Sequence, residues 1–118
     1  MNNRCLSPPQ LLGLIEIDEA GTVLYARLEK DEQRRDLSGL NLFSQLLSFR
    51  NVEEFRRRLN EFASGADPAN SFNFTCDFDD GPVPVRVLIA RIREKANGER
   101  TKSFLVHIRE SDENDNQQ

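Results

Sequence analysis

The sequence predicts an α+β fold, in which a five-stranded antiparallel sheet carries short helices packed on one face. Three observations predict it. In the stretch from Ser71 to Arg93, apolar and polar residues alternate before a turn, and a second strand-like run with Val85, Val87 and Ile89 in one phase follows it. The segment from Asn51 to Ser64 repeats apolar residues at helical spacing, and shorter alternating segments near both chain ends supply the remaining strands.

The central hairpin has the clearest pattern. Period 2 is typical of a strand that is buried on one face, and Asp79-Asp80-Gly81-Pro82 is typical of a turn. The strand after the turn is predicted over Val83–Ile92. The inner face is therefore predicted to carry Phe72, Phe74, Cys76, Phe78, Val85, Val87 and Ile89.

Two strands are predicted before the helices. Residues 1–10 are polar, contain Pro8-Pro9 and are expected to form a loose arm. Strands are predicted over Leu12–Asp18 and Thr22–Arg27, with a turn at Gly21. The alternation places Gly13, Ile15, Ile17, Leu24 and Ala26 toward the core, and Val23 and Tyr25 on the outer face.

Three helical segments are expected between the strand pairs. Glu29–Asp36 is almost wholly charged and predicts at best a short surface helix. Asn41 is expected to cap a short helix that ends at Leu47. Asn51 and Glu54 resemble a capping box for a longer helix, which Gly65 ends. The residues expected to point inward are Leu42, Phe43, Leu46, Leu47, Val52, Phe55, Leu59 and Phe62, with Arg56, Arg57 and Arg58 mostly off that face.

The chain is predicted to close with one strand and a tail. Lys95–Thr101 contains Asn97-Gly98 and is expected to be a solvated loop. Ser103–Glu110 is predicted to be the last strand, with Phe104, Val106 and Ile108 inward. Residues 111–118 are predicted to be a disordered, acidic and polar tail. The predicted domain therefore spans residues 11–110.

Composition restricts the class of protein. A chain of 118 residues supports one domain with one core. Its net charge of -4 does not favour binding to nucleic acid or to anionic membranes. Two cysteines, Cys5 and Cys76, do not make a disulfide framework, and neither a signal peptide nor a membrane-spanning segment is evident. We therefore expect a cytoplasmic protein.

Two motifs, together with the three closing strands, resemble a PAS domain over about Leu11 to Glu110. The first motif runs from Ile15 to Tyr25 and contains Asp18-Glu19-Ala20-Gly21; the second is Leu37-Ser38-Gly39-Leu40-Asn41-Leu42-Phe43. Gly39-Leu40-Asn41-Leu42-Phe43 and the phenylalanine-rich strand are most similar to the photoactive-yellow-protein branch. The resemblance implies a bacterial sensory module that signals through protein contacts.

The cofactors of that family are not expected here. The chromophore cysteine of the branch would fall at about Phe49, and the tyrosine that contacts the chromophore would fall at Ala26. The flavin-binding cysteine motif is replaced by Asn41-Leu42-Phe43-Ser44-Gln45-Leu46, and there is no helical histidine to ligate haem. We therefore predict no bound cofactor and no metal site.

Individual side chains with reactive chemistry have simple structural explanations. His107 is out of phase with the core residues and has no metal ligands at suitable spacing, so it is predicted on the outer face. Cys76 is predicted to pack in the core, where its thiolate is disfavoured. The arginines at Arg34-Arg35 and Arg56–Arg58 are interspersed with acidic residues, which favours a solvated helix over a nucleic-acid patch. No catalytic arrangement is evident, so we do not expect an enzyme.

The phenylalanines leave two alternatives open. Large rings more often fill space than frame a hole, which favours a filled core. The other alternative is an apolar pocket for a small hydrophobic or aromatic molecule. Its walls would be formed by Ile15, Ile17, Leu24, Ala26, Phe43, Leu46, Phe55, Leu59, Phe74, Cys76, Val87 and Val106.

The outer face of the sheet is predicted to be a contact surface. One face of an antiparallel sheet is normally polar when it meets water, but this phase is largely apolar. A homodimer is therefore expected through Val23, Tyr25, Leu88, Ala90, Ile92, Leu105 and His107, with Arg86 and Arg91 at the rim. The predicted function is a sensory module for a small ligand or a partner. The alternatives are a module that only dimerises and a small cone-shaped α+β enzyme, whose long N-terminal helix is missing here.

Overall fold

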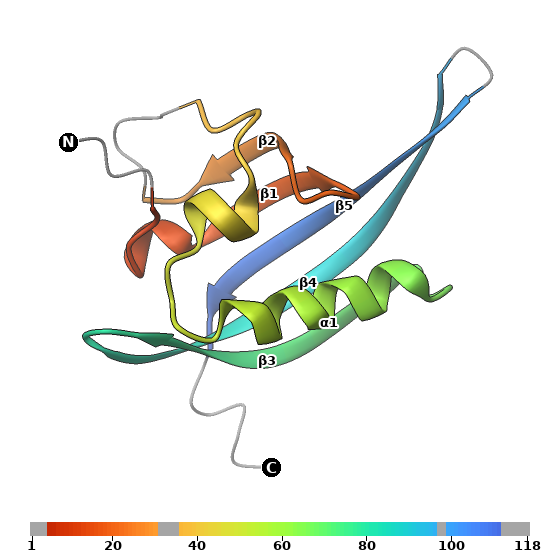
Figure 1. Cartoon of the computed structure of the whole chain (residues 1–118). Helices are drawn as coiled ribbons and strands as arrows, with labels where there is room; N and C mark the ends of the chain where they lie inside the picture. The colour runs from red at the N-terminus through yellow and green to blue at the C-terminus, as the bar shows by residue number, and fades with distance from the viewer. Residues whose placement is uncertain (1–4, 31–35, 97–98, 112–118) are drawn as a thin grey trace.

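The chain forms a five-stranded antiparallel sheet with strand order β2-β1-β5-β4-β3, and its helices lie on one side of the sheet (Figure 1). This confirms the predicted α+β class. The computed structural model describes residues 5–30, 36–96 and 99–111. The elements are η1 (Pro9–Leu11), β1 (Gly13–Asp18), β2 (Val23–Leu28), η2 (Leu42–Leu46), α1 (Val52–Ser64), β3 (Ala69–Phe78), β4 (Gly81–Ala96) and β5 (Glu99–Glu110).

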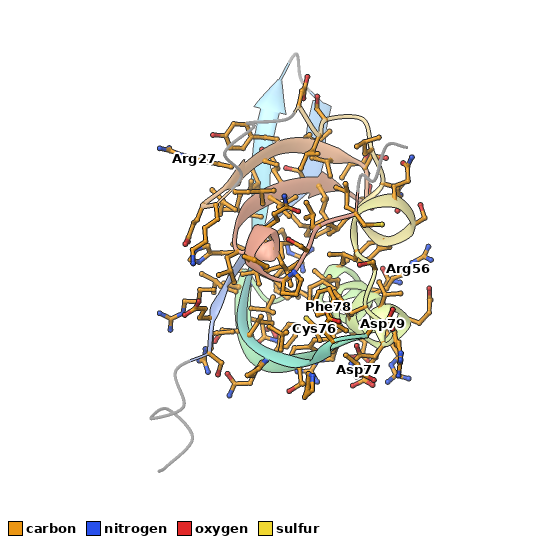
Figure 2. All side chains as sticks on the ribbon, turned by 90° about the vertical axis from the view of Figure 1, so that its left-hand side faces the viewer. Arg27, Arg56, Cys76, Asp77, Phe78 and Asp79 are labelled. Atoms are coloured by element: carbon orange, nitrogen blue, oxygen red, sulfur yellow. The ribbon has the colours of Figure 1, made fainter. Side chains whose placement is uncertain are left out.

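The hairpin β3–β4 has the predicted inner face. Phe72, Phe74, Cys76 and Phe78 are all buried, and the residues between them are exposed. Figure 2 shows Cys76 and Phe78 directed into the interior and Asp77 directed away from it. The period-2 pattern therefore predicted this strand correctly, because only one of its faces is covered.

The next hairpin is longer than the sequence suggested. Lys95–Thr101 was predicted to be a loop, but β4 continues to Ala96 and β5 begins at Glu99, and these two residues are paired. Only Asn97 and Gly98 lie between the strands. Asn-Gly is the preferred sequence of two-residue hairpin connections, which allow pairing up to the turn, whereas polar composition alone suggests a loop.

Helix α1 covers the β3–β4 half of the sheet with the predicted face. Phe55, Leu59 and Phe62 are buried, and Val52 is half-buried. The expected side-chain cap at Asn51 is wrong, because the Asn51 side chain makes no hydrogen bond to the first turn of α1. The Asn51 side-chain nitrogen instead donates to the Thr75 carbonyl over 2.8 Å, and the side-chain oxygen accepts from the Asp77 backbone amide over 2.9 Å. The unpaired backbone of the edge strand β3 competes successfully for this side chain.

The short helix η2 is a single π-type turn, in which the Leu47 amide donates to the Leu42 carbonyl. Asn41 caps it as predicted, accepting from the amides of Phe43 and Ser44. The same side chain donates to the Ala20 carbonyl over 3.0 Å and so joins η2 to the β1–β2 turn. Gly21 lies in that turn with a φ of 89°, and a Cβ there would meet the Phe43 ring at 2.8 Å.

The N-terminal segment packs on the domain from residue 5 onward, where the sequence predicted a loose arm. The Leu6 side chain is buried, and its amide donates to the Leu46 carbonyl over 2.8 Å. Leu11, at the end of η1, is buried as well. The sequence did not predict this contact, because Leu6 is a single apolar residue among polar ones and forms no periodic pattern.

Two other predictions lie largely outside the described residues. These are the surface helix at Glu29–Asp36 and the polar tail after Glu110. Among the described residues, no helix has the length and apolar character that crossing a bilayer would require.

Candidate functional site

The predicted pocket residues come together between the sheet and the helices, with one exception. Most of the set is almost completely buried, Ala26 is half-buried, and Leu24 is 48% exposed. The buried members are Ile15, Ile17, Phe43, Leu46, Phe55, Leu59, Phe74, Cys76, Val87 and Val106.

A bulge in β2 explains the exception. Ile17 is paired with Val23, but Glu16 is paired with Tyr25, so Leu24 is an extra residue opposite β1. The extra residue reverses the alternation at this point. Val23 therefore turns into the core and is 1% exposed, whereas the sequence placed it on the outer face. The predicted orientations of Val23 and Leu24 are thus wrong, and that of Tyr25 is right.

An aromatic cluster fills the α1–β3 half of the interior. Phe55 contacts Phe74 with ring centroids 5.1 Å apart in an edge-to-face arrangement. Phe49, which the sequence left in a linker, lies among the rings of Phe55, Phe74 and Phe78 at centroid distances of 5.5–6.0 Å. Its ring is 2% exposed. Sequence reasoning missed Phe49 because a residue between two helices belongs to no periodic set.

A small hollow lies between the β1–β2 turn, η2 and α1, and the exposed residues Glu19 and Asn60 line part of it. Ile17, Phe43, Leu59 and Phe104 are among its walls, and its volume is about 20 Å³. A single water molecule requires roughly 10–15 Å³ of such space. The hollow can hold about one water, so these side chains would have to move before a larger molecule could bind among them.

Cys76 lies in the aromatic half and has little nucleophilic character. The side chain is 1% exposed, and burial raises its pKa to about 12. A thiol with this pKa is protonated at neutral pH, and covalent attachment and redox chemistry need the thiolate. The geometry therefore fits a packing role for Cys76.

The opposite side of the sheet has an exposed apolar surface. We call it the open face, because the helices lie on the other side of the sheet. In Figure 2 Arg27 points away from the helices, whereas Arg56 lies beside them. Tyr25 and Leu88 are 49% and 44% exposed. The pairing of the strands places the residues of this face in rows across the sheet. One row contains Leu14, His107 and Leu88, and the next contains Tyr25, Glu16, Leu105 and Ala90. Beyond these rows, Ile92 lies opposite Ser103.

The predicted contact residues other than Val23 therefore share one surface, and Leu14 joins them. Leu14 alternates with the buried Ile15 and is half-buried. Ser103 donates from its hydroxyl to the Glu16 carboxylate over 2.8 Å, which satisfies one charged group within the apolar area. His107 lies on this face as predicted, and the described residues contain no group of three or more side chains suited to hold a metal ion.

Arg86 and Arg91 lie on different faces, although both were expected at the rim of the open face. Arg86 is on the open face and donates to Asn73 and Ser71 of β3. Arg91 is on the helix side, where its guanidinium donates to the carbonyls of Phe62 and Gly65 over 2.8 and 3.1 Å. It therefore neutralises the C-terminal end of α1 and cannot contribute to the rim.

Photoactive yellow protein from Rhodothalassium salexigens is 29% identical to this chain over 83 residues, which cover 67% of the chain. The domain is distantly similar to photoactive yellow protein. The match spans 66% of that protein's own length. No protein-family model matches the chain.

The resemblance places the chromophore cysteine of photoactive yellow proteins near Phe49, and this chain differs there. There the chain carries a phenylalanine ring packed among three others, in place of a cysteine. The buried thiol of the chain, Cys76, is on β3 and is held protonated by its surroundings. The chain therefore has a candidate ligand site in the aromatic interior and a candidate contact surface at the open face.

Proposed function

We propose that this chain is a PAS-like, non-enzymatic signalling module that responds to a small ligand or a partner and transmits its state through protein contacts on the open face. The observation that carries the proposal is the exposed apolar surface around Leu88 on a PAS-like sheet. An exposed apolar surface of this kind usually marks a contact site.

A second copy of the chain fits the charges of the open face. Beyond the apolar rows, one end of the face carries Arg86 opposite Arg109, and the other end carries Asp18, one row beyond Glu16. A two-fold axis that lies between the two faces and runs across the strands would place the basic end of one copy against the acidic end of the other. Dimerisation through this face would therefore bury the apolar rows and pair the charged ends.

A module that only dimerises is the second candidate. The small hollow beside Phe43 and Leu59 favours it, because this hollow has room for about one water. In that case the open face would act without a ligand in the core. Both candidate functions include a dimer, and they differ in whether the interior binds a ligand.

Native mass spectrometry of the purified protein separates these functions. We expect a dimer in either case. A retained small molecule, released on denaturation, would support the sensory module, and a dimer without added mass would support the second candidate. A monomer without added mass at high micromolar concentration would contradict both.

A further inference from the structure

The edge strand β3 is covered over only part of its length. At its C-terminal half the Arg50 amide donates to the Asp77 carbonyl over 2.8 Å, and the Asn51 side chain pairs with the Thr75 carbonyl and the Asp77 amide. The linker before α1 therefore occupies this part of the edge as another strand would.

The N-terminal half of the same edge has no such cover. In an antiparallel pair, alternate residues direct both backbone groups to the same side. Thr75 and Asp77 direct theirs to the edge, and the register with β4 is unbroken, so Ser71 and Asn73 do the same. Within the described part of the chain, the backbone groups of these two residues have no partner at the edge. Arg86 donates to both side chains and so holds this segment extended.

A groove of about 150 Å³ lies beside this free half, between the end of α1 and the start of β3. Its apolar surface comes from Phe62 and Phe72, and the Arg58 guanidinium lies 4.2 Å from the centroid of the Phe72 ring. Its remaining walls are formed by Glu61, Gly65, Asp67 and Asn70.

The charges of the groove favour a basic group. Glu61 and Asp67 contribute two carboxylates, and Arg58 contributes one cation, so the lining has a net negative charge. Neither carboxylate has an ion pair or a side-chain hydrogen bond among the described residues. A lysine or arginine side chain that enters the groove would bring its charge to these two carboxylates.

We propose that the free edge of β3 at Ser71 and Asn73 binds an extended peptide segment of a partner protein, which adds a strand to the sheet and places a basic side chain in the groove. Backbone hydrogen bonds to the edge would give affinity, and the groove would select the side chain that enters it. This surface is distinct from the open face, and the proposal does not depend on what covers that face.

The test uses two fluorescein-labelled peptides of alternating threonine and valine, one with a central lysine and one with a central glutamate. Addition of the lysine peptide to the full chain should shift the backbone amide signals of Ser71 and Asn73 in a nuclear magnetic resonance titration. Anisotropy should show weaker binding of the glutamate peptide. An unchanged spectrum at millimolar lysine peptide would overturn the proposal.

Two substitutions at one position isolate the edge. Ser71→Pro removes an amide that faces the edge, which is a position where strands tolerate proline. We expect it to weaken binding of the lysine peptide at least about tenfold, the loss that corresponds to one or two hydrogen bonds. Ser71→Ala removes only the hydroxyl contact with Arg86 and should bind nearly as well as wild type. Equal binding by both variants would overturn the proposal.

The groove is tested by reversing its charge. Glu61→Lys together with Asp67→Lys should reverse the preference from the lysine peptide to the glutamate peptide. Retained preference for lysine would show that the basic side chain lies elsewhere. If Ser71→Pro converts a dimer into a monomer, a second copy occupies this edge and the peptide partner is excluded.

Discussion

Phe55 has the most central position among the aromatic side chains of the interior. Its ring contacts Phe49, Phe72 and Phe74 and is 1% exposed. We expect Phe55→Ala to lower the free energy of unfolding by about 3–5 kcal/mol, because it removes a large buried ring and leaves a cavity. Arg57, on the exposed side of the same helix, should cost less than about 0.5 kcal/mol on truncation to alanine. Similar losses in urea titrations of the two variants would contradict the observed helix face.

Cys76 should make stability depend on alkaline pH. Burial raises its pKa from 9.0 to about 12 in the folded state. The unfolded thiol therefore ionises above pH 9 while the folded thiol stays neutral, so stability is unaffected below pH 9 and falls between pH 9 and pH 12. The slope for one group approaches about 1.4 kcal/mol per pH unit.

The measurement is a series of urea titrations from pH 8 to pH 11 on wild type and Cys76→Ala. The variant starts from a lower stability because it lacks the buried sulfur, but its stability should fall less steeply with pH. Parallel curves for the two proteins would show that the thiol ionises equally in both states.

At the scale of elements, Arg91 joins α1 to the sheet. Its side chain donates to four carbonyls at the end of α1 and just beyond it, those of Phe62, Ala63, Gly65 and Asp67. The last turn of α1 has no basic residue of its own, so β4 supplies the positive charge that favours a helix C-terminus. The guanidinium also lies 4.9 Å from the centroid of Phe62.

We expect Arg91→Ala to destabilise the domain by about 2–3 kcal/mol, because charged hydrogen bonds to the helix end are lost together. The control is Arg86→Ala, which removes two hydrogen bonds on the open face and should cost less than about 1 kcal/mol. Circular dichroism during thermal unfolding measures both. If Arg86→Ala were the more harmful change, the cap at α1 would not be the reason for the position of Arg91.

Local patterns in the sequence predicted the elements that follow one periodicity from end to end. The inner faces of β3 and α1 are examples, because a covered face requires an apolar residue at each repeat. The β2 strand was predicted at Thr22–Arg27 and runs over Val23–Leu28. The predicted orientations of Val23 and Leu24 were wrong, because a bulge inserts one residue without leaving a clear signal in a short strand.

The roles of Asn51 and Arg91 could not be predicted for a different reason. Asn51 has the sequence context of a helix cap, yet its amide pairs with a strand more than twenty residues away. Arg91 occupies an inward position on β4, and its partners lie at the end of a helix that the sequence alone does not place beside it. Local sequence rules describe neighbours in the chain, and both side chains bind distant backbone groups.

For the whole molecule, the open face is the proposed contact surface. Its apolar rows run across neighbouring strands around Leu88, Leu105 and Leu14, and its charged residues separate into a basic and an acidic end. A charge placed at Leu88 would therefore have to be buried at the centre of a dimer, where an unpaired carboxylate is costly. The same charge on a monomer would stay in water.

We expect Leu88→Glu to shift the protein from dimer to monomer without unfolding it, because Leu88 is 44% exposed in one copy and contributes little to the interior. The control is Asn60→Glu, which adds the same charge on the exposed surface of α1 and should leave the dimer intact. Light scattering at matched concentrations measures the mass of each protein, and circular dichroism confirms that each remains folded. A wild-type protein that is monomeric at high micromolar concentration, or a Leu88→Glu variant that remains dimeric, would rule out a second copy as the partner of the open face.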